Sequence, residues 1–401
     1  MMAIAGGVTA PKGYRAAGVA AGIKPNSAKL DCALVASDVP SIVAGVFTTN
    51  VMKAPCIAWN QQVCARGMAQ AAFINSGNAN AATGDRGLAD VKATAALVAA
   101  GLNLAPDSVC VCSTGVIGVP LPMDRIGNGV RGCLESLSPA GGADAARAIM
   151  TTDLVPKERA VEMPLSWGRA RLGAIAKGSG MIAPNMATMI CVITTDVSVA
   201  AGPLRDALRK AVDASFNRIC VDNDMSTSDA VLCFANGQAG GGALAPGTED
   251  YETFSAALTE LCKELAQDLV RDGEGATKFV EIAVSGADTN ENAQKTARAI
   301  ATSTLCKTAF FGQDPNWGRI ACAAGYSGVA FDPAKASIWI EDIQLMRDGA
   351  AAAFVEAEAA ACMQRPAFRI RVSLGDGPGE ATYWTCDLSH DYVAINADYR
   401  T

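Results

Sequence analysis

The sequence is poor in histidine and in aromatic residues, and these shortages exclude several kinds of functional site. Only one of its 401 residues, His390, is a histidine, so a zinc site built on two or three histidines is impossible. A mechanism that needs an imidazole base must use His390 or do without one. Aromatic residues make up 5% of the chain, which leaves no stacking platform for single-stranded nucleic acid.

The sequence also lacks basic clusters and long apolar runs. It carries 40 acidic and 33 basic side chains, and phosphate contacts need clustered lysine and arginine, so we expect no nucleic-acid partner. The apolar stretch 93–105 is too short to span a bilayer. The first residues have neither the charged region nor the apolar core of a signal peptide. We therefore expect a cytoplasmic protein with no membrane partner.

Cysteine is plentiful, but no two cysteines form a CxxC pair. Several lie within apolar runs, where cysteine packs as a small hydrophobic residue, so the fourteen are expected to be free thiols in a reducing compartment. The nucleotide signatures fail as well. The glycine-rich segment 272–278 follows a predicted helix and precedes a predicted strand, the reverse of a dinucleotide-binding order. We expect no metal and no cofactor.

Hydrophobic patterning predicts an α/β protein. The predicted strands are 31–37, 42–48, 71–77, 108–118 and 187–197, and the predicted helices are 88–102, 203–216, 255–270 and 349–363. The strand at 187–197 is apolar on both faces and is expected to be central and buried. The length and the renewed mixture of strands and helices after residue 279 predict two domains, 1–278 and 279–401.

The stretch 177–196, KGSGMIAPNMATMICVITTD, has two interpretations. Thr188 suits the start of a strand simply because it is β-branched. Alternatively, a threonine that follows a small residue at a tight turn can attack the preceding carbonyl by an N→O acyl shift. Hydrolysis of that ester would leave Thr188 as a new N-terminus. Its amine, with an ordinary pKa of about 7.7–8.0, would then serve as the base for its own hydroxyl.

Such a nucleophile needs groups that stabilise an oxyanion, and the segment 113–118, STGVIG, is a candidate. A predicted strand ends here, and Gly115 allows its backbone N–H to approach a ligand closely. The hydroxyl of Thr114 offers a second donor. Taken alone, the segment also fits an ordinary strand-to-turn connection.

These segments, with others along nearly the whole chain, resemble the ornithine acetyltransferase family of arginine biosynthesis, also known as bifunctional glutamate N-acetyltransferases. The matching motifs are GGVTAPKG (6–13), FTTNVMKAP (47–55), INSGNANAATG (74–84), STGVIG (113–118), KGSGMIAPNMATM (177–189), SFNRICVDNDMSTSD (215–229), DGEGATKF (272–279), KTAFFGQDPNWGRI (307–320) and INADYRT (395–401). The elements PNMATM and DGEGATKF together are highly specific. Asn223 stands where the family pattern leads us to expect glycine.

The resemblance implies a fold and a set of site residues. The fold is an α/β arrangement of stacked sheets and helices, similar to that of certain self-cleaving aminopeptidases. Cleavage between Ala187 and Thr188 gives chains 1–187 and 188–401, which stay together as an α2β2 assembly. Thr188 is the nucleophile, and Thr114 and Gly115 form the oxyanion hole. The implied substrate contacts are Thr151 (with Thr152 a close rival), Lys177, Thr188, Glu274, Asn396 and Thr401.

The implied reaction transfers the acetyl group of N2-acetylornithine to glutamate through an acetyl-Thr188 intermediate. Lys177 suits a substrate carboxylate and Glu274 suits an ammonium group. His390 belongs to no matched motif and is expected to be a bystander. No motif in the sequence decides whether acetyl-CoA is also an acetyl donor, and we expect a bifunctional enzyme that uses it. The alternatives are an enzyme restricted to acetylornithine, a self-cleaving amidohydrolase or aminopeptidase, and a binding protein without activity.

Overall fold

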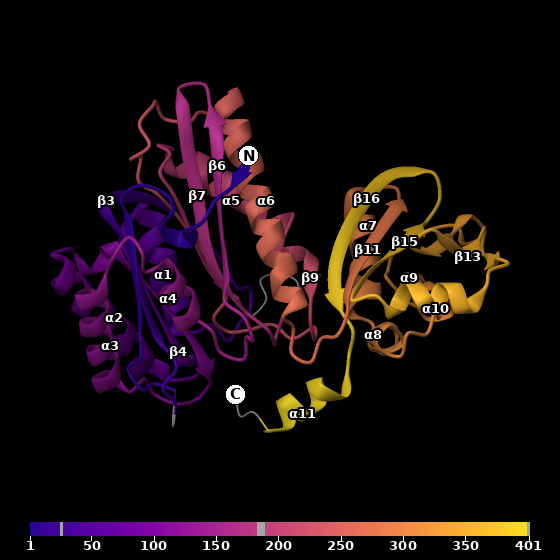
Figure 1. Ribbon diagram of the computed structural model, residues 1–401, viewed down its shortest axis with the longest axis horizontal. Helices are drawn as coiled ribbons and strands as arrows, with labels where there is room; N and C mark the ends of the chain where they lie inside the picture. Colours follow the sequence, from indigo (N-terminus) through magenta and orange to yellow (C-terminus); the bar gives the residue numbers. More distant parts are fainter. Residues whose placement is uncertain (25–26, 183–188, 399–401) are drawn as a thin grey trace. The chain divides into compact units, whose positions relative to one another are not determined.

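The computed structural model describes residues 1–24, 27–182 and 189–398, and the chain divides into two compact units (Figure 1). Among the described residues, the first unit comprises Met1–Asn217 and Asp224–Leu269, and the second comprises Arg218–Asn223 and the residues from Val270 to Asp398. The domain limits predicted from the sequence, 1–278 and 279–401, stay a prediction.

The first unit is built on a nine-stranded sheet. Its strands are β1 Met2–Ala3, β2 Tyr14–Val19, β3 Cys32–Phe47, β4 Met68–Asn78, β5 Val109–Val116, β6 Lys157–Leu165, β7 Gly168–Lys177, β8 Ile190–Thr195 and β10 Ala230–Ala235. The order is β1-β6-β7-β8-β10-β3-β4-β5, and β2 pairs with β3. The predicted central strand is β8, whose six residues are all buried.

The prediction of two separate strands at 31–37 and 42–48 is wrong, because both segments belong to strand β3. It is one strand of 16 residues. Its first part pairs with β2 and β4, and its last part pairs with β10. The register against β4 shifts between Ala36 and Ser41, and Pro40 lies in this irregular part. Proline has no N–H to donate to a neighbouring strand, and it is tolerated at a bulge because the regular hydrogen bonding is interrupted there. The strand therefore connects the two halves of the sheet.

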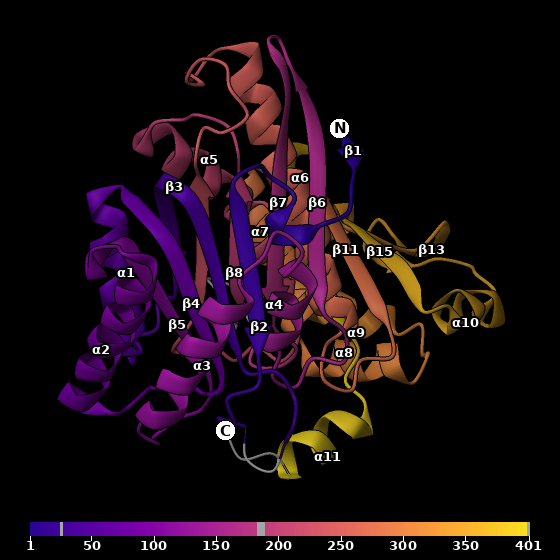
Figure 2. The ribbon, with the colours of Figure 1, turned by 60° about the vertical axis from the view of Figure 1, so that its left-hand side comes forward.

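Helices cover this sheet (Figure 2). They are α1 Pro55–Arg66, α2 Gly84–Leu102, α3 Met123–Ser136, α4 Gly142–Ala148, α5 Ala201–Asp213 and α6 Glu249–Arg271. Helices α1 and α2 contact β5, α3 and α4 contact β2, and α5 contacts β3. The predicted helices near 88–102, 203–216 and 255–270 are confirmed as α2, α5 and α6. The apolar residues that defined the α5 and α6 faces are buried: Leu204, Leu208, Val212, Leu258, Leu261, Cys262, Leu265 and Leu269.

The second unit contains a seven-stranded sheet of order β14-β13-β12-β15-β11-β16-β9. Its strands are β9 Ile219–Cys220, β11 Phe279–Gly286, β12 Ser337–Ile340, β13 Ile343–Arg347, β14 Ala350–Ala351, β15 Ala367–Ser373 and β16 Gly377–Cys386. Its helices are α7 Asn290–Thr302, α8 Thr304–Phe311, α9 Trp317–Gly325, α10 Glu356–Gln364 and α11 His390–Asp398. The chain is thus an α/β protein with two sheets, as the sequence predicts.

The predicted alanine-rich helix at 349–363 begins later than expected. Gly349 has a φ of +78°, which suits a tight turn, and Ala350–Ala351 continue as the short strand β14. The helix α10 starts only at Glu356. In the part of the chain that the structure describes, no helix combines the length and the apolar character needed to cross a membrane.

Candidate functional site

The ends of three neighbouring strands bring together the surroundings of the predicted nucleophile. The antiparallel pairing of β7 with β8 sets Lys177 opposite Ile190. The parallel pairing of β8 with β10 sets Ala230 opposite Ile190, so Asp229 precedes β10 beside Met189. The predicted cleavage residues Ala187 and Thr188 come just before Met189 and lie outside the described residues.

Thr114 and Lys177 are in contact although their strands are far apart in the sheet. Strands β8, β10, β3 and β4 separate β7 from β5, which in a flat sheet would put them about 24 Å apart. The Lys177 ammonium nevertheless donates a hydrogen bond of 3.5 Å to Thr114 Oγ1, and both residues are buried. The sheet must therefore curve strongly. Because Thr114 Oγ1 accepts from an ammonium, its own O–H is free to point elsewhere as a polarised donor.

Asp153 organises the polar groups around this contact, a role that the sequence reasoning missed. Its carboxylate accepts hydrogen bonds from the Lys157 ammonium at 2.6 Å and from the backbone N–H groups of Gly178 at 2.7 Å and Thr151 at 2.9 Å. The only sequence signal was its place in the MTTD segment that carries Thr151. The carboxylate thus ties Thr151 to the end of β7, where Lys177 lies.

The charge on Asp153 is stabilised within a buried setting. Burial opposes ionisation, but the positive charges of Lys177 and Lys157 and the Gly178 N–H overcome it and lower the pKa of Asp153 to about 2. The ionised carboxylate therefore faces two ammonium groups. This surplus of positive charge suits the binding of an anion, such as a developing oxyanion or a substrate carboxylate.

Gly115 lies at the end of β5 in a conformation that only glycine adopts easily. Its φ is +129°, and a Cβ at this position would come within 2.4 Å of the Gly77 carbonyl carbon. The neighbouring Ser113 hydroxyl donates to Asn75 Oδ1 at 2.7 Å, and Asn75 in turn donates to the Asn78 carbonyl at 2.8 Å. The motifs 74–84 and 113–118 thus support each other, which fixes the backbone at the predicted oxyanion hole.

Two predicted substrate contacts, Glu274 and Asn396, belong to the second unit. Asn396, on α11, donates to Glu274 Oε2 at 2.8 Å. The loop that carries Glu274 is held by Gly275, which has a φ of +67° and where a Cβ would come within 2.5 Å of the Tyr392 nitrogen. The loop ends on Asp387, which accepts from the backbone and hydroxyl of Thr277. The predicted contact Thr401 lies outside the described residues.

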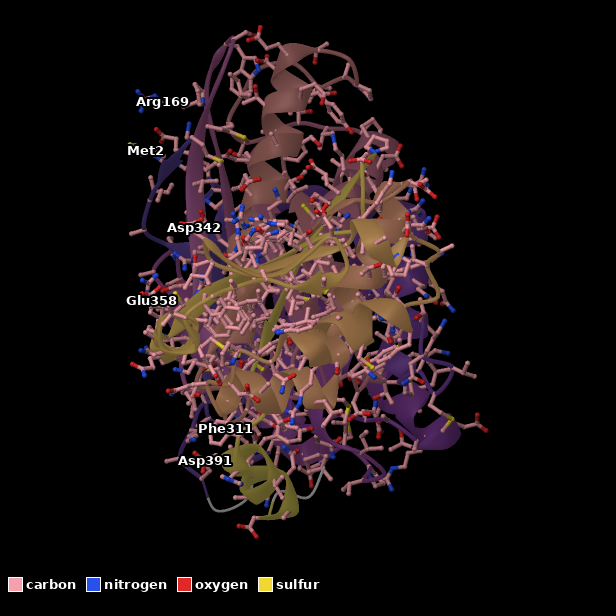
Figure 3. The ribbon with its side chains drawn as sticks, turned by 90° about the vertical axis from the view of Figure 1, so that its right-hand side faces the viewer. Met2, Arg169, Phe311, Asp342, Glu358 and Asp391 are labelled. Carbon is pink, nitrogen blue, oxygen red and sulfur yellow. The ribbon has the colours of Figure 1, made fainter. Side chains whose placement is uncertain are left out.

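His390 starts helix α11 and is exposed. Its ring packs edge-on against the Phe311 ring, with the ring centres 5.4 Å apart. Phe311 ends α8 and lies beside the start of α11, where Asp391 follows (Figure 3). The observed contact is therefore one of packing at the helix start.

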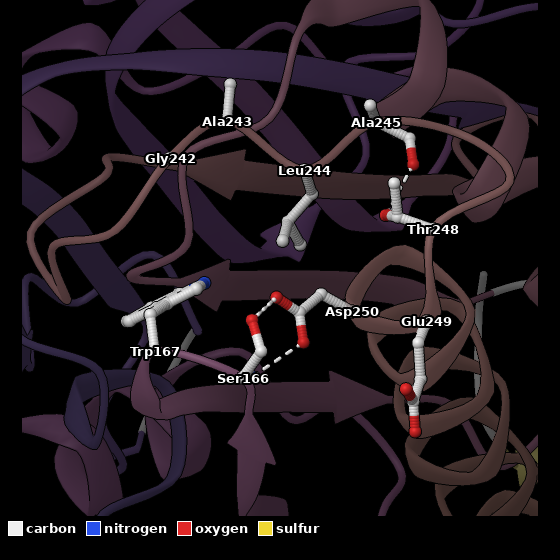
Figure 4. A pocket seen from close by; sticks show the side chains of 9 residues that line it. All are labelled: Ser166, Trp167, Gly242, Ala243, Leu244, Ala245, Thr248, Glu249 and Asp250. Atoms are coloured by element: carbon white, nitrogen blue, oxygen red, sulfur yellow. Dashed lines mark hydrogen bonds between the residues drawn. The ribbon is translucent and has the colours of Figure 1, made fainter.

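A hollow of about 300 Å³ lies elsewhere in the first unit (Figure 4). It is lined by Ser166, Trp167, Gly242, Ala243, Leu244, Ala245, Thr248, Glu249 and Asp250. Ser166 donates to Asp250 through both its N–H and its hydroxyl at 2.7 Å, so this carboxylate serves the local turn. None of the predicted site residues lines this hollow. Among the described residues, no three histidine, cysteine or acidic side chains form a metal-binding group.

Comparison with known proteins gives the family of the chain. A family model described as the ArgJ family matches residues 15–401. The arginine biosynthesis bifunctional protein ArgJ of Symbiobacterium thermophilum is 51% identical over 399 residues, and the match covers 99% of each chain. The protein of the same name from Synechocystis is 45% identical over 408 residues, covering 99% of this chain and 98% of that one.

One solved structure extends the comparison to the fold. The crystal structure of the arginine biosynthesis bifunctional protein ArgJ from Bacillus halodurans is 42% identical, with a TM-score of 0.50, and covers 51% of this chain and 97% of that chain. The α/β fold and the motif matches define an acyl-transferring enzyme. The chain belongs to the ArgJ family, and it is an acetyltransferase of arginine biosynthesis.

Proposed function

We propose that the enzyme transfers the acetyl group of N2-acetylornithine to glutamate through an acetyl ester on Thr188. The observation that carries this proposal is the buried contact between Lys177 and Thr114, near the start of β8, where the chain continues from Thr188. In this contact the Lys177 cation polarises the Thr114 hydroxyl, which makes that hydroxyl a stronger donor to an oxyanion in acyl transfer.

The proposed reaction has two halves. In the first, the Thr188 amine takes the proton from Thr188 Oγ, which attacks the acetyl carbonyl. The Gly115 N–H and the Thr114 hydroxyl hold the oxyanion. The Thr188 ammonium then gives its proton to the ornithine nitrogen, the bond from this nitrogen to the acetyl carbon breaks, and ornithine leaves as the acetyl ester forms. In the second, the glutamate amine attacks the ester carbonyl, and the bond from this carbon to Thr188 Oγ breaks. The Thr188 amine passes a proton from the attacking amine to Thr188 Oγ, and N-acetylglutamate leaves. Because the ester also reacts with water, the site must exclude water from it.

Substrate contacts are proposed for the remaining predicted residues. Lys177, near the ionised Asp153, suits the substrate carboxylate, and Glu274 suits an ammonium group. The polar groups of Thr151, Asn396 and Thr401 complete the set.

We also propose that the chain cuts itself between Ala187 and Thr188 and that the products remain together. Strands β7 and β8 lie on either side of this bond in the sequence and pair over six residues on each strand, and β3 pairs with β10 in the same way. Chains 1–187 and 188–401 would thus share one sheet. The solved chain of the Bacillus halodurans relative supports the cleavage. The match covers 97% of that chain but only 51% of the present one, so the solved chain has about the length of one cleavage product. Two copies of each product make the proposed α2β2 assembly.

The source of the acetyl group and the compartment complete the proposal. The curated relatives are named bifunctional, which supports acetyl-CoA as a second acetyl donor to glutamate. The cysteines are all free thiols in the structure, which supports a reducing compartment and thus the cytoplasm.

The test is to incubate the purified enzyme with N2-acetylornithine, with and without glutamate, and to measure released ornithine. Steady ornithine release should require glutamate, because water does not replace it as acceptor. Ornithine release at the same rate without glutamate would instead indicate a hydrolase. A parallel reaction with acetyl-CoA and glutamate should yield N-acetylglutamate in a bifunctional enzyme.

A further inference from the structure

Asp229 is a buried carboxyl group that the proposed acetyl transfer does not use. It precedes β10 and has no exposed surface. Its Oδ1 accepts a hydrogen bond of 3.0 Å from the Met189 N–H, whereas its Oδ2 has no hydrogen-bond partner in the described structure. Leaving a buried carboxyl oxygen unpaired is unfavourable, so this arrangement needs an explanation.

The register of the sheet determines where this carboxyl lies. Because Ala230 pairs with Ile190, Asp229 lies beside Met189. The Met189 nitrogen is covalently bonded to the carbonyl carbon of Thr188. Covalent geometry alone keeps the nitrogen and the hydroxyl oxygen of Thr188 within about 5 Å of the Met189 nitrogen. With the hydrogen bond of 3.0 Å between Asp229 Oδ1 and the Met189 nitrogen, covalent geometry therefore limits the distance from this carboxyl to the two Thr188 atoms that exchange a proton to about 8 Å or less.

The surroundings of Asp229 favour its neutral form. Burial raises its pKa well above the ordinary range, although the Met189 N–H, the Lys177 charge and the nearby hydroxyls of Ser226 and Thr48 act in the opposite direction. The Thr48 hydroxyl donates to the Ser226 carbonyl rather than to Oδ2. A neutral carboxyl has an O–H that can give a proton and a carbonyl oxygen that can accept one.

We propose that Asp229 relays the proton in the N→O acyl shift at Thr188, an inference that rests on the self-cleavage proposed above. As Thr188 Oγ bonds to the Ala187 carbonyl carbon, its proton passes to one oxygen of the Asp229 carboxyl. The other oxygen gives its proton to the Thr188 nitrogen as the bond between Ala187 carbon and that nitrogen breaks. Asp229 ends neutral, as it began. Water then hydrolyses the ester, which restores the Thr188 hydroxyl and frees the Ala187 carboxyl group.

The variant that tests this relay is Asp229→Asn. Its amide oxygen can still accept the Met189 N–H, but the amide cannot relay a proton. Asp196→Asn is the matched control, because Asp196 follows the other end of β8, is also buried and accepts N–H groups from Lys12 and Arg171. Full-length chains are made by cell-free translation, and the rate of cleavage is followed on denaturing gels. Circular dichroism of purified protein checks that both variants fold.

We expect Asp229→Asn to slow cleavage by about 100-fold or more, the scale of general acid–base catalysis, and Asp196→Asn to leave the rate within about threefold. Wild-type cleavage should slow as the pH rises and Asp229 ionises, and Asp229→Asn should lack this fall. Hydroxylamine, which cleaves esters, should not rescue the variant, because the ester does not form.

Three results would overturn the relay. The first is a folded Asp229→Asn chain that cleaves at the wild-type rate, and the second is equal slowing by Asp196→Asn. The third is full rescue of Asp229→Asn by hydroxylamine, which would mean that Asp229 acts only after the ester has formed. A wild-type chain that stays whole would instead overturn the self-cleavage itself, together with this inference.

Discussion

At the scale of single residues, the first unit holds several buried charged groups that stabilise one another. Asp153 contacts the Lys157 ammonium and two backbone N–H groups, and the charge of Lys177 adds to their effect. A buried carboxylate that lost these partners would be strongly unfavourable. Because the pKa of Asp153 is lowered, we expect the free energy of unfolding to depend on pH in the acidic range.

Replacing Asp153 by asparagine should lower the free energy of unfolding by about 2 kcal/mol at pH 7, since the folded pKa of about 2 lies below the ordinary 3.8. Because this pKa is depressed, the contribution is complete above about pH 4 and is lost as the pH falls toward 2. Urea unfolding measured from pH 7 downward should show the difference from wild type shrinking only below about pH 4. Asp144→Asn, which removes an exposed ion pair with Arg147, should change stability by less than about 1 kcal/mol. A constant difference down to pH 2 would contradict this account.

Asn223 shows how a departure from the family pattern is tolerated. The sequence led us to expect glycine there, and Asn223 has a φ of +69°. This left-handed conformation is open to glycine, and asparagine is among the residues that adopt it most readily. The substitution therefore fits the local backbone.

At the scale of elements, the end of β5 and the turn after β4 fit together without space for a side chain. Gly115 has a φ of +129°, and an added Cβ would meet the backbone of Gly77 and Asn78 within 2.6 Å. The position of the Gly115 N–H is therefore determined by the packing of two backbones. Any shift of this turn would move the proposed oxyanion hole.

Gly115→Ala should destabilise the protein by about 2–4 kcal/mol, because alanine is strained at a φ of +129° and its Cβ would clash with the Gly77 backbone. It should also reduce acetyl transfer at least about 100-fold, because the clash would displace the residue 115 N–H from the proposed oxyanion hole. The matched control is Gly118→Ala, since Gly118 has a φ of +81° but nothing lies within 4 Å of the added Cβ. It should cost about 1–2 kcal/mol and leave most of the activity. Urea unfolding and the ornithine-release assay measure both effects. Equal losses in the two variants would show that the tight approach to Gly77 is unimportant.

At the scale of the whole molecule, the sequence predicts the local elements better than the distant contacts. The buried strand β8 and the helices α5 and α6 followed from hydrophobic spacing. The single strand β3 was missed because its two halves pair with different partners, which spacing alone does not reveal.

The candidate site was predictable only where a motif marked a residue. Thr114, Gly115 and Lys177 lie in quoted motifs, but their strands are separated in sequence, and only the curved sheet brings Thr114 to Lys177. Asp153 and Asp229 were missed although Asp229 ends the quoted motif 215–229 and Asp153 lies in the MTTD segment. Both are single acidic residues whose importance comes from burial and from partners distant in the sequence, such as the Gly178 and Met189 N–H groups.

The most direct test of the central claim is the intact mass of the enzyme after incubation with N2-acetylornithine in the absence of glutamate. The account predicts two chains, 1–187 and 188–401, that elute together under native conditions. One acetyl group should appear on the second chain, at Thr188, and disappear when glutamate is added. Thr188→Ala should give one uncleaved chain without acetyl. A single wild-type chain of full mass, or two chains that gain no acetyl group, would contradict the account.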